Sequence, residues 1–153
     1  MKRLTYVFVL LLLVLGIAPA AWAGPEDEIL QLIQQRTQAF NEGNLEAFMA
    51  GFADNAAVVP SLAPFRIEGK EALRAFFAQL FQAFPTRRFV GWQRSIRVYG
   101  GTTAVLNAYY TLTLVDRTGK VTTTHGRQNL TFVKLGDRWV VVDQHNSVIP
   151  ASP

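Results

Sequence analysis

A change in hydrophobic period constrains this chain more than any other feature. From Arg88 onward, apolar and polar residues alternate, and Val, Thr, Phe, Tyr and Trp are frequent. Alternation of this kind is typical of strands that bury one face. It predicts four long strands over residues 88–99, 102–115, 121–135 and 138–149. Because the connections between them are short and rich in Gly and Asp, the strands are expected to pair as an antiparallel meander.

The residues before this point follow a helical period instead. Pro25 and the three acidic residues after it are typical of a helix start, and Gly43 is a plausible stop. The apolar stripe of this first helix consists of positions that recur at helical spacing: Ile29, Leu32, Ile33, Arg36 and Phe40. The pattern therefore predicts one amphipathic helix over residues 25–42.

Two more helices and a short strand are expected before residue 88. Asn44 can cap a second helix whose apolar face ends at Phe52, and Asp54-Asn55 is expected to terminate it. Residues 56–60 form a strand candidate, which Pro60 and Pro64 confine to an edge or a loop. A third helix opens at Gly69-Lys70-Glu71, and its stripe of Phe and Leu residues is expected to pack in the core. The predicted fold is α+β, with three helices on one face of a curved antiparallel sheet.

The first 23 residues have the order of a secretory signal peptide. Lys2 and Arg3 precede an apolar run to Ile17, and Ala21-Trp22-Ala23 offers a cleavage site. The apolar run is shorter than the roughly 20 residues that a spanning helix needs. We therefore expect cleavage after Ala23, a single domain over 24–153, no stable membrane anchor afterwards, and an exported, periplasmic or extracellular protein.

Composition excludes several classes of function. The 153 residues include no Cys and two His, which excludes thiolate chemistry and Cys-based zinc or iron–sulfur sites, so no metal site is predicted. When Lys2 and Arg3 leave with the signal peptide, 13 basic residues remain against 11 acidic ones, a net charge of +2. The remaining Arg residues are scattered, which gives no support to nucleic-acid binding. No phosphate-binding glycine loop is found, and no cofactor is predicted.

Alternation assigns each side chain of the strands to a face. The set expected to face the helices is mostly apolar: Val90, Trp92, Ile96, Val98, Leu106, Ala108, Tyr110, Leu112, Leu114, Leu130, Phe132, Val140 and Val142. This assignment requires a three-residue loop ending at Arg138, because a two-residue Gly136-Asp137 loop would put Val140 and Val142 on a different face from Leu130 and Phe132. Trp139 and Val141 are then apolar exceptions on the outer face.

Several polar residues fall within the apolar set: Arg94, Tyr110, Gln128, Gln144 and Asn146. A polar group on a buried face is costly unless it is paired. These residues either reach solvent near the sheet ends or surround a cavity and bind a ligand's polar atoms. In the second case the candidate ligand-binding residues are Trp92, Tyr110, Gln128, Leu130, Phe132, Gln144 and Asn146.

Several short motifs resemble those of one family. Residues 40–46 (FNEGNLE) resemble its first interhelical loop, 52–56 (FADNA) its step after the second helix, and 67–73 (IEGKEAL) the start of its third helix. Residues 139–147 (WVVVDQHNS) resemble its last strand, with Asp143 at a position where His is usual. In order and spacing the chain resembles the nuclear transport factor two-like superfamily, in its SnoaL-like and ketosteroid-isomerase-like branch.

The resemblance implies a cone-shaped sheet closed by helices. Proteins with this fold include both enzymes and binding or assembly domains. The last strand also resembles the association domain of calcium/calmodulin-dependent kinases. The arginines that reach into the cone of that domain correspond to Tyr110, Leu130 and Asn146 here. The resemblance therefore does not predict an anion-binding pocket of that type.

Candidate acid–base residues are few. Asp143 and His145 are two apart on one strand and face outward in our assignment, where they form either a catalytic pair or a polar cross-strand ladder. Asp54 is either a general base at the cone mouth or a turn residue. Tyr110 could donate to an oxyanion, and Trp92 could stack on a flat ligand.

Two functions follow, with a third left open. The first is an exported homodimer, paired through the outer sheet face with Trp139 and Val141 at its centre, that binds a small, largely apolar molecule in the cone. The alternative is a cofactor-independent isomerase, dehydratase or cyclase that uses Asp143/His145 or Tyr110. It requires a carboxylate or His facing the cone. A purely structural, self-associating role is the third.

Overall fold

Three helices and six strands make up the part of the chain that the computed structural model describes, residues 24–150. In chain order they are α2 (Pro25–Glu42), α3 (Leu45–Ala50), β1 (Phe52–Val59), β2 (Ile67–Glu68), α4 (Lys70–Ala83), β3 (Thr86–Tyr99), β4 (Thr103–Val115), β5 (Val121–Leu135) and β6 (Arg138–Val148). The predicted signal peptide, residues 1–23, lies outside the described residues. Among the described helices, none has the length and apolar character needed to cross a membrane.

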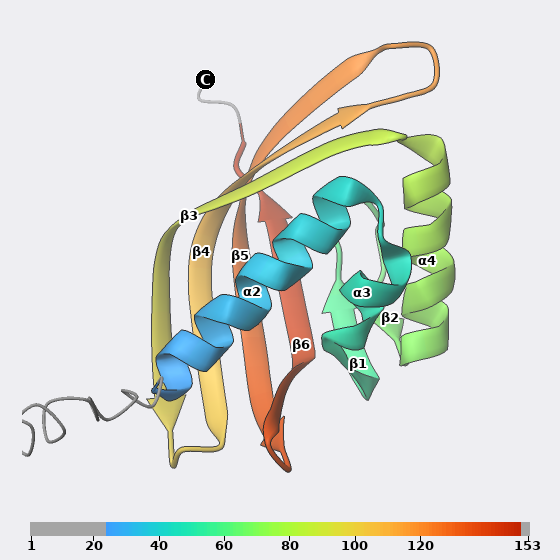
Figure 1. The fold of residues 1–153 in the computed structure, drawn as a ribbon. Helices are drawn as coiled ribbons and strands as arrows, with labels where there is room; N and C mark the ends of the chain where they lie inside the picture. Colours follow the sequence, from blue (N-terminus) through green and yellow to red (C-terminus); the bar gives the residue numbers. More distant parts are fainter. Residues whose placement is uncertain (1–23, 151–153) are drawn as a thin grey trace, which may run out of the picture.

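All six strands belong to one curved sheet, and α2 lies across it (Figure 1). The strand order is β2-β1-β6-β5-β4-β3, and β3 to β6 form the predicted antiparallel meander. β1 pairs in parallel with β6, and the two-residue β2 covers the outer edge of β1. The predicted α+β class is therefore confirmed, whereas the parallel pairing and β2 were not predicted.

The helices begin and end largely where the turn residues indicate. Gly43 ends α2 in the left-handed region, with φ of 78°, a conformation that costs glycine little. The Asn44 side chain caps α3 by accepting from the Ala47 N–H at 3.0 Å. The expectation that this second helix runs to Asp54 was wrong. Phe52 instead starts β1 opposite Val141, whose N–H donates to the Gly51 carbonyl at 2.9 Å.

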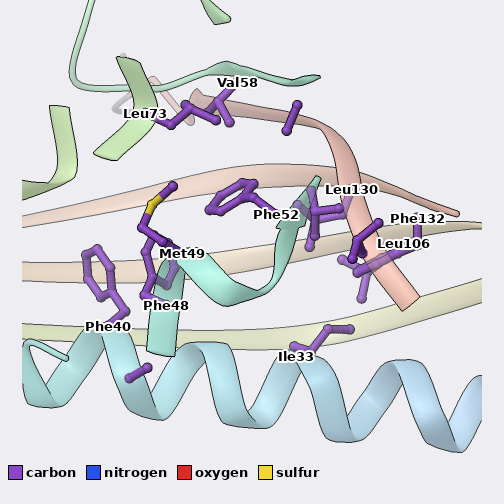
Figure 2. Close-up of a cluster of buried hydrophobic side chains, with 14 of the residues drawn as sticks. Ile33, Phe40, Phe48, Met49, Phe52, Val58, Leu73, Leu106, Leu130 and Phe132 are labelled. Atoms are coloured by element: carbon purple, nitrogen blue, oxygen red, sulfur yellow. The ribbon is translucent and has the colours of Figure 1, made fainter. Parts of the chain in front are cut away.

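A cluster of aromatic rings joins the helices to the sheet (Figure 2). Phe48 of α3 makes edge-on contact with Phe77 of α4, at 4.7 Å between ring centroids, and with Phe52 of β1, at 5.5 Å. Burial of a Phe side chain stabilises a fold by about 1.5–3 kcal/mol. The helical stripes predicted as core thus pack against the inner face of the sheet.

Part of the predicted inner face of β3 was wrong, because this strand contains a bulge. Ile96 lies opposite Leu106, but Trp92 lies opposite Tyr109 on the outer face, because four steps along β3 match three along β4 between these two pairs. Gln93, inside the bulge, has φ of 48°. The extra residue inverts the alternation, so Val90 and Trp92 project outward, contrary to expectation, and each is 42% exposed.

The last hairpin also differs from prediction, in two compensating ways. Its loop is the two-residue Gly136-Asp137 turn that we rejected, since Leu135 pairs with Arg138. As that turn requires, Val140 lies opposite Val133 and Val141 opposite Phe132, so Val140 does not share the face of Phe132 as expected, although it is buried with the core, at 2% exposed. A bulge at Val142 then restores the parity, and Thr131 pairs with Asp143.

The same shift moves Trp139 and Val141 away from the proposed dimer face. Val141 is fully buried opposite Phe132, and the Trp139 indole N–H donates to the Glu28 carboxylate of α2 at 2.7 Å. Both side chains therefore belong to the helix side of the sheet. The expectation that they form the apolar centre of an outer interface was wrong.

Candidate functional site

A cavity of about 80 Å³ lies between the inner face of the sheet and helices α2 and α4. Most of its lining is apolar: Ile33, Phe40, Phe48, Val58, Pro60, Leu62, Phe76, Phe77, Leu80, Phe89, Leu112 and Leu130. Leu62, which follows β1, is 43% exposed and marks the mouth. A mostly apolar cavity with a small polar contribution is the usual composition of a small-molecule site.

Three side chains of β5 and β6 form a polar row on the floor of this cavity. Gln128 donates to the Asn146 Oδ1 at 3.2 Å, and Gln144 donates to the same oxygen at 3.4 Å. Gln128 lies opposite Asn146 in the ladder, and the Val142 bulge turns Gln144 and Asn146 inward. Of the predicted ligand-binding residues, the structure thus brings Gln128, Leu130, Gln144 and Asn146 together around one cavity.

Arg36 of α2 faces this row from the opposite wall. Only 6% of the residue is exposed, and its Nη2 donates to the Gln144 Oε1 at 3.3 Å. The guanidinium carbon lies 4.1 Å from the centroid of the Phe52 ring and 5.0 Å from that of Phe48. Burial lowers the pKa of Arg36 to about 9, so the side chain remains charged at neutral pH.

Arg36 has one further donor group without a partner. Its Nη1 is buried and has no hydrogen-bond acceptor among the described residues. A buried, unsatisfied donor is rare in folded proteins and costs free energy, more so when it carries charge. Among residues 24–150, Nη1 of Arg36 is the one buried side-chain donor or acceptor without a hydrogen-bond partner.

No acidic side chain compensates this charge. The chain has 11 Asp and Glu residues, all within the described range, and none lines the cavity. Nine of them are exposed, and the other two, Glu28 and Asp116, are half-buried elsewhere. The four ion pairs found within residues 24–150 do not include Arg36. The cavity is consequently electropositive.

Tyr110 lies beside the cavity rather than within its lining. It is fully buried, its ring stacks on Phe89 at 5.1 Å, and its hydroxyl donates to the Ser61 Oγ at 2.9 Å. Burial raises the pKa of Tyr110, and the Ser61 hydrogen bond partly opposes this rise. Ser61 itself lines the cavity, so Tyr110 positions this polar group at the mouth.

The other candidate residues are not at the cavity. Phe132 is fully buried in the core, and Trp92 stacks on Tyr109 on the outer face, at 5.1 Å between ring centroids. Asp54 is exposed and pairs with Lys70 at 3.4 Å. Arg94 is exposed on β3.

Asp143 and His145 are also outside the cavity. Both are exposed on β6, where they lie opposite Thr131 and Asn129. They belong to a polar ladder on the outer face that includes a contact of 3.0 Å between Thr111 Oγ1 and His125 Nδ1. Across residues 24–150, no three His, Asp or Glu side chains are grouped so that they could hold a metal ion.

Arg36 was not recognised from the sequence, although a signal was present. It occupies the apolar stripe of α2, seven residues after Ile29 and four before Phe40, and all three residues are buried. A charged residue at a core position of a helix is unusual unless a partner or a ligand neutralises it. The position of Arg36 in the apolar stripe of α2 therefore indicated a buried charge that needs a partner or a ligand.

The chain belongs to the SnoaL-like domain family, which matches residues 29–152. A comparison with curated proteins gives no match.

Solved structures show the same fold in the nuclear transport factor two-like superfamily. A superfamily member from Salmonella enterica serovar Typhimurium is 19% identical with a TM-score of 0.75, and the match covers 84% of this chain and 94% of that one. A candidate calcium/calmodulin-dependent protein kinase II association domain from Xanthomonas campestris is 22% identical with a TM-score of 0.76, and coverage is 90% and 95%. A candidate scytalone dehydratase from Novosphingobium aromaticivorans is 14% identical with a TM-score of 0.74, and coverage is 80% and 83%. At these identities the likeness establishes the fold alone.

Proposed function

We propose that this protein binds a small, largely apolar molecule in the cavity between α2, α4 and the sheet. The observation that carries the proposal is the convergence of Gln128, Gln144 and Asn146 on an otherwise apolar cavity. Buried amides are usually arranged to pair with one another or with a bound group. The cavity volume of about 80 Å³ is below the roughly 300–1,000 Å³ of sites for drug-sized ligands. The buried part of the ligand therefore comprises a few non-hydrogen atoms.

A ligand screen on the chain starting at residue 24 tests this proposal. Small uncharged alcohols and amides are added to isotopically labelled protein, and amide chemical shifts are followed by NMR. We expect shifts to concentrate on residues of β5, β6 and α2 that line the cavity. Leu80→Trp at the wall of the cavity should abolish these shifts. Gln79→Trp, which adds the same ring at the exposed neighbouring position, should leave them unchanged. Saturable binding that survives Leu80→Trp would contradict the proposal.

Isomerase or dehydratase chemistry is less well supported by the same site. Such a reaction requires a proton acceptor facing the substrate. Neither His nor any carboxylate lines the cavity, and Asp143 and His145 project from the outer face. Tyr110 lies beside the cavity rather than in its lining, and its raised pKa keeps it a hydrogen-bond donor at neutral pH.

We also propose that the protein forms a homodimer through the outer sheet face and is exported. With Trp139 and Val141 buried, the apolar part of that face includes Val90, Trp92 and Tyr109, beside a ladder of Thr, Asn and His side chains. Exposed aromatic residues and Arg, such as Arg127 opposite Tyr109, are a favourable composition for an interface. The expected signal peptide at residues 1–23 supports export.

Sedimentation and fractionation test these two statements separately. Sedimentation velocity should give a dimer for the chain starting at residue 24 and a monomer for Trp92→Glu. Phe65→Glu, at an exposed apolar position in the loop after β1, should remain dimeric. A monomeric parent protein would contradict the dimer. For export, the full chain is expressed in a bacterium, and the extracytoplasmic fraction should contain protein that starts at residue 24.

A further inference from the structure

We propose that the cavity recognises a small monocarboxylate, and that the guanidinium of Arg36 binds its carboxylate. This inference rests on the proposed small-molecule function and specifies the chemical class of the ligand. It predicts that the ligand has two parts, an anionic head at Arg36 and a short apolar chain among the Phe and Leu side chains that line the cavity.

The first argument is the unsatisfied state of the guanidinium. Arg36 is 6% exposed, its Nη2 is committed to Gln144, and its Nη1 has no acceptor within the described part of the chain. Because a buried charge without a partner is strongly unfavourable, such groups are normally paired with an opposite charge. A bound carboxylate would supply both the missing charge and the missing hydrogen-bond acceptor.

The second argument is that the side chain is held in place before any ligand arrives. The rings of Phe48 and Phe52 flank the guanidinium, and Gln144 fixes Nη2. Gly51 makes room for the stem, because a Cβ at this position would lie 2.6 Å from the Arg36 Cδ. Prior positioning of this kind lowers the entropy cost of binding. Arg36 thus has the features of a binding residue rather than those of a flexible surface charge.

The third argument concerns the number of charges and the size of the ligand. Arg36 is the one Arg, Lys or His in the cavity lining, so it matches one negative charge. A phosphate group carries about −1.5 to −2 at neutral pH and three strong acceptor oxygens, more than this wall can satisfy. A carboxylate, in contrast, matches the planar donors of a single guanidinium. The volume of about 80 Å³ leaves room for a short chain beyond it.

The amide row offers a second contact for the same head group. Asn146 Oδ1 accepts from both Gln128 and Gln144, so the Asn146 Nδ2 remains available as a donor. Two of the three amide oxygens, those of Gln144 and Asn146, thus accept from protein donors, and N–H groups of Arg36 and Asn146 remain for an incoming anion. This polarity favours a carboxylate over a cation or an amine.

Three probes that share a four-carbon chain test the inference: butyrate, butyramide and butanol. Calorimetry and NMR titration are performed on the chain starting at residue 24 at pH 7 and fixed ionic strength. We expect butyrate to bind at least about tenfold more tightly than butyramide, since it alone carries the charge that Arg36 lacks. Arg36→Met should remove this preference while retaining butanol binding. Arg36→Gln provides the same test should the Met variant not fold.

A matched control removes an equivalent charge elsewhere. Arg88 is exposed on β3 and faces outward opposite Thr113, so Arg88→Met changes the net charge equally and should leave the butyrate preference intact. Butanol binding without a preference for butyrate would overturn this inference and leave the proposed small-molecule function standing. Butyrate affinity that survives both Arg36 substitutions would likewise overturn it. If none of the three probes binds, the proposed function itself fails, and the inference fails with it.

Discussion

At the scale of single residues, Gly126 determines where Tyr110 can lie. The two residues are directly opposite in the β4–β5 ladder, and the Tyr110 ring covers the glycine. A Cβ at residue 126 would collide with that ring and would lie 2.5 Å from the Ser147 backbone oxygen. Because backbone cannot yield as a flexible side chain does, we expect Gly126→Ala to lower the free energy of unfolding by about 1–3 kcal/mol.

Urea denaturation of the ligand-free protein measures this change. Arg127→Ala, at the exposed neighbouring position, is the control and should stay within about 0.5 kcal/mol of the parent. A Gly126→Ala variant as stable as the control would show that Tyr110 does not occupy this position.

A second residue-scale prediction concerns Glu28, which joins α2 to the sheet. Hydrogen bonds from Lys134, at 2.8 Å, and Trp139, at 2.7 Å, hold the pKa of Glu28 below its ordinary value. A carboxyl group whose pKa is lowered by folding stabilises the protein at pH values above its unfolded pKa, about 4.3, and loses that effect as the pH falls through the folded pKa. Glu28→Gln should therefore lower the melting temperature at pH 7.

The difference in melting temperature between Glu28→Gln and the parent should shrink as the pH falls below about 4. Glu28 of the parent protein is then protonated and has also lost its charge. Glu26→Gln, at an exposed position in the same first turn of α2, is the control and should have little effect at either pH. Melting temperatures at pH 7 and pH 3 provide the comparison. A Glu28→Gln difference that does not change with pH would exclude a charge effect.

At the scale of elements, the sequence predicts strands far better than it predicts their faces. The alternation from Arg88 onward and the turn residues defined all four long strands, since these signals are local. The bulges in β3 and β6 are set by pairing with neighbouring strands, and alternation alone does not reveal them. Val90, Trp92 and Val140 were consequently assigned to the wrong face. Gln144 and Asn146 were assigned correctly, because the turn and the bulge of β6 offset each other.

The bulge in β3 leads to a prediction about its own backbone. Gln93 is the single described non-glycine residue with positive φ, and residues with a Cβ are strained there by about 1–3 kcal/mol. Gln93→Gly should relieve this strain and leave the protein at least as stable as the parent. Ser95→Gly, two residues further along β3, should cost about 0.5–1 kcal/mol, because glycine weakens a regular strand. Equal losses in both variants, measured by urea denaturation, would contradict the assigned bulge.

At the scale of the whole molecule, Arg36 suits the proposed ligand site in the cavity but not the stability of the core around it. The fold closes an aromatic core around α2, α3 and the sheet, and a methionine at position 36 would suit that core better than a charge. The presence of a buried guanidinium at this position is therefore best explained by ligand binding rather than by the stability of the ligand-free protein. Conflict between local stability and a site of this kind is common where a protein binds a ligand.

This conflict can be measured without any ligand. Because burial lowers the pKa of Arg36 to about 9, folding disfavours the charged form, and the penalty is fully present below pH 9. It diminishes as the pH rises above the folded pKa, where the native state no longer binds the proton that the unfolded chain retains. We expect Arg36→Met to raise the free energy of unfolding at pH 7 by about 1–3 kcal/mol, even after loss of the hydrogen bond to Gln144. The gain should shrink at pH 10. A variant that is markedly less stable than the parent at pH 7 would instead identify Arg36 as a structural residue, which stabilises the fold through Gln144 and the two Phe rings.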